Sequence, residues 1–336
     1  MLSHSDVSRA HWCIVNDDYG PGWPLGSATD RSPVQYCRFG GEATPLQRAL
    51  HRAASIAPAS QIMLTALEEY RDMWEPSVWL VRPYRRFIGD NRWASHLSSA
   101  AAILSVATRS PSSVVTVLPA RCYVADEWIL ARGIRHALSA LPGVPEGVLT
   151  LGMLDMEDGV DENYLVVGQP RFGRGLSAAG FARRPVAWVA RHLKSHGALV
   201  ASGIMIGYAG VFAAHISKNW PGISNTLAKL SHAAEIAGEE CDIPSSLNRE
   251  SAKSALRALR WHPPSFRQRV ISVCRSGWSG LNSPQSVARI TDFLSCESKP
   301  GRGFPPDYSS YNRSIKDHLL SGPDNYLSAL AGPDFT

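Results

Sequence analysis

The first half of the chain alternates short apolar runs with helical patterns, and this alternation constrains the fold more than any other feature. The apolar runs are rich in β-branched residues and have the length of buried strands. Strands joined by helices build a parallel sheet that is covered on both faces. We therefore predict an α/β fold with a doubly wound, mostly parallel sheet. The expected strands are Trp12–Asn16, Gln61–Thr65, Val78–Arg82, Val114–Leu118 and Val148–Met153, and the expected helices are Pro45–Ile56, Ala94–Ala107 and Asp126–Leu141.

The pattern changes after Pro170, where a second lobe is expected to complete the same domain. We place the larger α/β half at residues 1–170, the smaller lobe at 171–298 and an irregular tail, rich in Pro, Gly, Ser and Asp, at 299–336. The lobe is predicted to contain a strand at Leu176–Ala182, a helix at Val186–Lys194, a buried strand with the start of a helix within 197–214, and helices at Ile223–Ala237 and Ser251–Trp261.

Composition narrows the class of protein. The chain has 336 residues, 44% of them hydrophobic, which is enough for one large core. Its formal charge of +5 comes from scattered arginines and not from a basic block, so we expect no nucleic-acid partner. Six cysteines without a C-x-x-C pair predict a reduced, cytoplasmic protein. The uncharged stretch 197–214 contains glycines that fit a strand and helix better than a membrane span.

The segment VVTVLPARCYVADE at 114–127 raises the central question. A buried strand is expected to end in Leu-Pro, and a helix is expected from Asp126, so Arg121 and Cys122 lie in a loop at the edge of the sheet. Such loops commonly carry the chemistry of an α/β protein. A protein that handles phosphates would place a metal-binding carboxylate here, yet this chain has an arginine.

Six segments follow one another in an informative order. They are PVQYC at 33–37 with GG at 40–41 and TPLQRAL at 44–50, LPARCYVADE at 118–127, LGM at 151–153 with ENYLVVG at 162–168, FARRP at 181–185, GALVAS at 197–202, and GWSGLNSP at 277–284. In this order they resemble the motifs of sugar-1-phosphate nucleotidyltransferases of the mannose-1-phosphate guanylyltransferase type. The resemblance implies their fold, a Rossmann-type sheet of the GT-A-like kind, with residues 1–170 as the nucleotide-binding half and 171–298 as a smaller sugar-binding lobe.

The resemblance also implies an activity, the transfer of a nucleotide to a sugar 1-phosphate with release of pyrophosphate. In the family, magnesium bridges the phosphates and is held by the Asp of "LPADH" and the Asp of "WSDLG". Magnesium prefers hard oxygen ligands and neutralises charge in the transition state. The matching positions here are Arg121 and Gly280, so both carboxylates are missing.

Other positions that match the family's substrate contacts have also changed. The lysine of "PKQ" is Val34, the glycine-rich loop is replaced by NDDYGPGWPL at 16–25, and both the Trp and Asn of "WNS" are lost. Glycine lets a main chain approach a phosphate closely, so that loss weakens the expected triphosphate site. The substrate-binding candidates that remain are Gln35, Gly22, Asn163, Tyr164, Arg183, Arg184 and Ser202.

We therefore predict a nucleotidyltransferase-like pseudoenzyme with no cofactor and no metal. It would act as a sensor of a sugar nucleotide or nucleotide, or as the partner of an active paralogue or pathway enzyme. The first alternative is a divergent nucleotidyltransferase that holds magnesium with Asp17, Asp18 or the acidic run 155–162, although we expect that run to be a solvated loop.

The second alternative is a pocket repurposed for metal-free chemistry and lined by Arg121, Cys122 and Arg183. The plainer expectation is that Cys122 is inert and that Arg121 faces solvent or pairs with Asp126 or Glu127.

Overall fold

The computed structural model describes residues 10–17, 32–38, 43–90, 94–154, 162–168, 176–244, 247 and 267–297. Internal contacts group the chain into two compact units, Met1–Ile290 and Thr291–Thr336. The fold and the site described below belong to the first unit. The helix predicted at 251–261 and the tail predicted at 299–336 lie outside the described residues.

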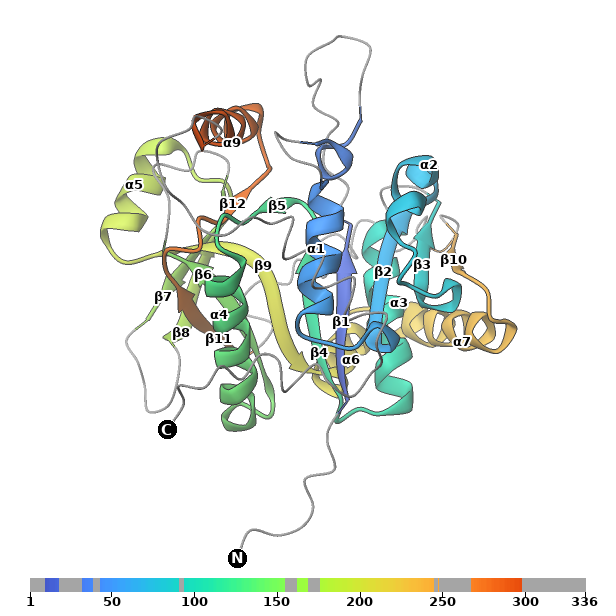
Figure 1. Cartoon of the computed structure of the whole chain (residues 1–336). Coiled ribbons are helices and arrows are strands. Elements are labelled where there is room, and N and C mark those ends of the chain that lie inside the picture. The colour runs from blue at the N-terminus through green and yellow to red at the C-terminus, as the bar shows by residue number, and fades with distance from the viewer. Residues whose placement is uncertain are drawn as a thin grey trace, which may run out of the picture. The chain divides into compact units, whose positions relative to one another are not determined.

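A sheet of ten strands runs through the first unit in the order β10-β3-β2-β1-β4-β9-β6-β11-β8-β7 (Figure 1). The strands before residue 120 pair in parallel, while β9 runs antiparallel between β4 and β6. The predicted doubly wound, mostly parallel sheet is therefore confirmed, with antiparallel pairings at β9 and β8. The strands are β1 (His11–Asn16), β2 (Ile62–Leu67), β3 (Arg86–Gly89), β4 (Val114–Pro119), β6 (Gly147–Met153), β7 (Tyr164–Val167), β8 (Leu176–Ala182), β9 (Leu199–Tyr208), β10 (Cys241–Ile243) and β11 (Arg267–Val273).

Helices cover both faces of this sheet, as Figure 1 shows for α1 and α4 in front and α3 and α7 behind. Successive side chains of β1 point to opposite faces, so Cys13 and Val15 join one buried group and Ile14 joins the other. The helices are α1 (Pro45–Ala54), α2 (Arg71–Trp74), α3 (Ala94–Arg109), α4 (Glu127–Ala140), α5 (Ala187–Ser195), α6 (Ala209–Asn219), α7 (Pro221–Ala237) and α9 (Pro284–Glu297).

Local sequence signals set the ends of the helices that flank the site. Thr44 accepts the backbone N–H of Gln47 at the start of α1, and the Gln47 side chain returns the bond to the Thr44 N–H, which is a capping box. Leu46 and Leu50 of α1 are buried against the sheet. Asp126 caps α4 by accepting the N–H of Ile129 at 3.0 Å.

One predicted strand is wrong. Residues 78–82 form turns between two short 3₁₀ helices, Glu75–Ser77 and Pro83–Arg85, and the strand follows at β3. Pro76 and Pro83 each lie in one of those 3₁₀ helices, where their fixed φ angle suits a turn. Val78 and Val81 lie in this loop, yet their side chains are buried. The apolar run therefore has the pattern of a strand without forming one.

The uncharged stretch 197–214 forms β9 and the beginning of α6, as expected. Within the described part of the chain, every helix is too short or too polar to cross a membrane.

Candidate functional site

A two-stranded antiparallel ribbon brings together the two positions that match the family's metal ligands. It is formed by β5 (Cys122–Tyr123) and β12 (Ser279–Gly280), with Cys122 opposite Gly280. The N–H of Leu281 donates to the carbonyl oxygen of Arg121 at 3.3 Å. Positions 121 and 280, which are far apart in the sequence, therefore lie side by side.

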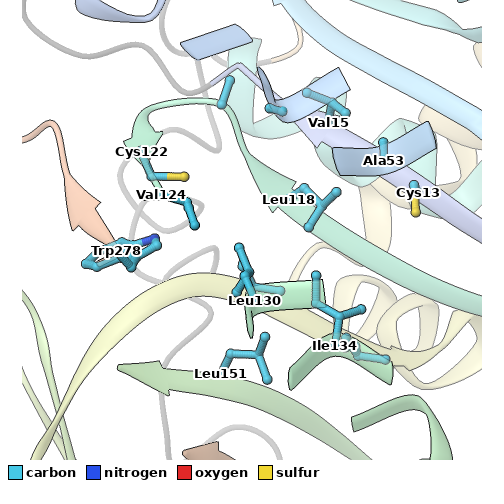
Figure 2. Close-up of a cluster of buried hydrophobic side chains, with 14 of the residues drawn as sticks. Cys13, Val15, Ala53, Leu118, Cys122, Val124, Leu130, Ile134, Leu151 and Trp278 are labelled. Carbon is cyan, nitrogen blue, oxygen red and sulfur yellow. The ribbon is translucent and has the colours of Figure 1, made fainter. Parts of the chain in front are cut away.

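The ribbon is fixed to the carboxyl ends of the central strands by backbone bonds and by packing. The N–H of Ala120 donates to the carbonyl of Asn16 at the end of β1 at 2.9 Å. Trp278 is buried beside Cys122 and Val124 (Figure 2). Gly277 has φ +59°, and a Cβ there would lie 2.6 Å from the Cβ of Ala125. Only glycine fits this point, so the approach of the two segments is built into the sequence.

Cys122 is part of a buried structural cluster and not an activated nucleophile. Arg52 donates to both carboxylate oxygens of Glu127, at 2.8 and 2.7 Å, and its Nη1 lies 3.6 Å from the Cys122 sulfur. Burial raises the pKa of the Cys122 thiol, against the opposing charge of Arg52. Glu127 is thus held by Arg52, and Asp126 caps α4.

Glu162 occupies the space in front of Gly280. Its side chain is buried, with a residue exposure of 6%, and it accepts a hydrogen bond from Asn282 at 2.9 Å. A Cβ on Gly280 would lie 2.6 Å from Oε1 of Glu162. The expectation that residues 155–162 form a solvated loop is therefore wrong for Glu162, whereas 155–161 lie outside the described residues. A carboxylate therefore does lie next to position 280, but it belongs to Glu162, in a different segment of the chain.

The environment of Glu162 brings its protonation into the neutral range. Burial raises the pKa of the carboxyl to about 7, although the hydrogen bond from Asn282 and the positive charges of Arg121, Arg289 and Arg184 act in the opposite direction. Perturbed carboxyl pKa values of this kind cluster at functional sites. Sequence reasoning missed Asn282 and Arg289, because neither belongs to a matched contact position.

Three predicted substrate-binding residues lie near one another around this carboxyl. Asn163 and Tyr164 follow Glu162 directly, and the Asn163 side-chain oxygen accepts the N–H of Arg184 at 3.3 Å. Arg184 has φ +39°, which is unusual for a residue with a side chain, and its side chain is exposed. Arg183 is also exposed. Tyr164 is completely buried in the core, so its side chain can stabilise the fold next to Glu162 but cannot contact a ligand.

The remaining predicted residues do not join this group. The hydroxyl of Ser202 donates to the Leu151 carbonyl at 2.7 Å and accepts the N–H of Ile204 at 3.0 Å, close to an irregularity in the β6–β9 pairing. Ser202 therefore stabilises the irregular part of the β6–β9 pairing. Gln35 is buried in the 3₁₀ helix Val34–Tyr36. Gly22 lies outside the described residues.

A second polar cluster lies at the carboxyl ends of β1 and β2, where open α/β sheets bind ligands. The Tyr36 hydroxyl donates to the buried Asp17, and burial together with that carboxylate raises the pKa of Tyr36. Asn16 accepts hydrogen bonds from Thr65 at 2.8 Å and Ser99 at 3.0 Å. Tyr36, Thr65 and Ser99 were not predicted, because Tyr36 and Ser99 lie in a 3₁₀ helix and in α3, and only the packing of those helices brings them to the end of β1.

The described residues at the ribbon do not fit the magnesium ion that the family resemblance implies. Magnesium needs several oxygen ligands. Arg121 offers positive charge, Gly280 has no side chain, and Glu162 is a single carboxyl with a pKa of about 7. Within the described ranges, no three His, Cys, Asp or Glu side chains are arranged to hold a metal ion.

Comparisons with known proteins support the fold. No family model and no curated protein matches the sequence. A solved structure described as mannose-1-phosphate geranyltransferase from Thermus thermophilus is similar, with a TM-score of 0.62 and 21% identity, over 83% of this chain and 78% of that one. A structure described as mannose-6-phosphate isomerase from Helicobacter pylori has a TM-score of 0.58 and 13% identity, over 81% of this chain and 99% of that one.

Identities this low establish similarity of fold, and one fold can host unrelated activities. The two similar structures carry the names of two different reactions, so the fold alone does not decide the chemistry of this chain. The mixed, mostly parallel sheet is the α/β fold that the motif order predicted, and it is similar to the fold of these two structures.

Proposed function

We propose that this protein binds a sugar nucleotide or sugar phosphate without performing magnesium-dependent nucleotidyl transfer, and so acts as a pseudoenzyme. One observation carries the proposal. The β5–β12 ribbon places Arg121 beside Gly280, at the two positions that match the family's metal carboxylates. A slip in the motif alignment is a poor explanation for the missing carboxylates, because the two positions are neighbours in the fold.

The chemistry of the replacement favours binding over catalysis. Nucleotidyl transfer depends on a cation that contacts the reacting phosphates and neutralises charge as it develops. A guanidinium group binds phosphate tightly and with directional hydrogen bonds, but it cannot coordinate two phosphates and a water as magnesium does. Arg121 therefore supports recognition of an anionic ligand while the metal-dependent step is lost.

The class of ligand is proposed from the two similar structures, whose names both contain a mannose phosphate. A sugar phosphate or its nucleotide derivative is the ligand class that this fold and the positive charges at the ribbon accommodate. The biological role would be that of a sensor. If no such ligand binds, a role as the partner subunit of an active enzyme is the remaining form of the same proposal.

The first experiment is a thermal-shift screen of the whole protein with NDP-sugars, nucleoside triphosphates and sugar 1-phosphates, each with magnesium or with EDTA. A ligand at one hundred times its dissociation constant stabilises a protein by about 2.7 kcal/mol, which such a screen detects easily. We expect a shift that is the same with magnesium and with EDTA, and no release of pyrophosphate. Magnesium-dependent pyrophosphate release by the unmodified protein would refute the proposal.

A further inference from the structure

Arginines from three separate segments direct their charge at the single buried carboxyl of Glu162. Arg121 lies between β4 and β5, Arg184 follows β8, and Arg289 is in the first half of α9. Each of the three lowers the pKa of Glu162 through its positive charge. Three arginine charges from separate segments therefore act on this one carboxyl.

One of these arginines has a buried donor without an acceptor. The Nε of Arg289 is buried and forms no hydrogen bond with any of the described residues. An unsatisfied buried donor on a charged group is unfavourable, so the structure favours any anion that can supply an acceptor there. Arg184 is exposed, so solvent and small anions can approach the group from its side.

We propose that Arg121, Arg184 and Arg289 form a binding site for a phosphoryl group, and that the carboxylate of Glu162 competes with this group for the three guanidinium groups. The inference rests on the proposed function in one respect, that the ligand carries a phosphoryl group. It adds that an anion binds at the place that corresponds to the family's cation. The carboxylate of Glu162 is an internal anion at the same place.

Competition of this kind links binding to protonation. Arginine stays charged at all physiological pH values, and Asn282 does not titrate, so Glu162 is the one group among those named that changes charge near neutrality. Its pKa of about 7 means that a proton can neutralise it at little cost. A phosphoryl group that displaces or neutralises the carboxylate is therefore expected to bind with uptake of one proton at pH 8.

Sulfate is the best first probe, because it is a tetrahedral dianion whose charge does not change between pH 6 and pH 8. If sulfate binds the form in which Glu162 is protonated, a pKa of about 7 makes its affinity about tenfold higher at pH 6 than at pH 8. The measurement is isothermal titration calorimetry of the whole protein at low ionic strength, where screening is weak.

Variants separate the site from general surface charge. Glu162→Gln keeps the size of the side chain but removes its charge, so we expect tight sulfate binding with the same affinity at both pH values. Arg289→Gln is expected to weaken binding about tenfold or more, as for loss of a charge-assisted contact. Arg184→Gln gives a second test if Arg289→Gln does not fold, because Arg184 is exposed. Arg135→Gln on α4 and Glu239→Gln after α7 are matched controls on exposed residues and should bind like the parent.

The outcomes distinguish this inference from the proposed function. Equal affinity of the parent at pH 6 and pH 8, or equal affinity of the parent and Glu162→Gln at pH 8, would refute the competition. A thermal shift with an NDP-sugar that Arg289→Gln and Arg184→Gln leave unchanged would refute the anion site and leave the proposed function standing. Sulfate binding with the expected pattern, combined with no shift from any NDP-sugar or sugar phosphate, would support the site and reject the proposed binding of a sugar nucleotide or sugar phosphate.

Discussion

Substituting Gly280 with alanine tests the contact on which the description of the site depends. The added Cβ would lie 2.4 Å from Nδ2 of Asn282, and 2.6 and 2.8 Å from the two carboxylate oxygens of Glu162. These distances are far shorter than van der Waals contact, so the two side chains must move. Both are held in place, because Glu162 is buried and the two are hydrogen-bonded to each other.

The expected loss of stability follows from these contacts. Overpacking a buried site by one methyl group costs about 1–3 kcal/mol. Breaking the Asn282–Glu162 hydrogen bond adds about 1 kcal/mol. We therefore expect Gly280→Ala to lower the free energy of unfolding by about 2–4 kcal/mol, which urea denaturation measures as a shift in midpoint at constant slope.

A double-mutant cycle tests whether the loss of stability comes from the contact between residues 280 and 162. Glu162→Ala removes the carboxylate, so Gly280→Ala should cost less in that background, with a coupling of about 1 kcal/mol or more. Gly222→Ala in α7 is the matched control, because a Cβ there meets nothing within 4 Å. The reasoning is refuted if Gly280→Ala leaves stability unchanged or costs the same with and without Glu162.

Three further predictions concern the surroundings of the site. Arg52→Ala leaves Glu127 partly buried without its partner, so urea denaturation should show a loss of about 3–5 kcal/mol, and a loss under about 1 kcal/mol would contradict a structural ion pair. In the native protein a thiol reagent should label the exposed Cys274 and spare the buried Cys122, and fast labelling of Cys122 would show that its environment is misjudged. Because the folded-state pKa of Glu162 is raised from 4.5 to about 7, the folded state binds the extra proton, and stability should fall as pH rises between these values, by on the order of 3 kcal/mol relative to Glu162→Gln. A Glu162→Gln variant with the same pH profile of urea midpoints as the parent would exclude that assignment.

Sequence reasoning located the sheet because each element carries its own local signal. The β-branched run of β4 ends at Pro119, and Thr44 with Gln47 marks the start of α1. The failure at residues 78–82 has the same origin, because an apolar loop between prolines carries the local signal of a strand without its pairing. An apolar pattern predicts a strand correctly when the segment also pairs with a neighbouring strand. The same pattern is misleading when the buried apolar residues lie in a loop.

Only part of the site could be predicted from the sequence, and the reason is different. The motifs at 118–127 and 277–284 pointed to Arg121 and Gly280, and the ribbon brings them together. Nothing in the sequence indicated that Glu162 would enter the space in front of Gly280, because that contact depends on how β7 is placed against β12 by the rest of the sheet. The approach of Arg289 from α9 is equally nonlocal. Long-range packing, and not the pattern of any one segment, decides the charge of the site.

Glycine at 280 and glutamate at 162 are best understood as one feature of this chain. A side chain at 280 would collide with the Glu162 carboxylate, so the absence of that side chain is what allows Glu162 to be buried there. The negative charge that the family resemblance assigns to two positions has been reduced to one carboxyl, and arginines now face it. Restoring an aspartate at 280 alone would therefore not rebuild a metal site, because the new carboxylate would be forced against Glu162 in a buried space where two like charges cannot both remain ionised.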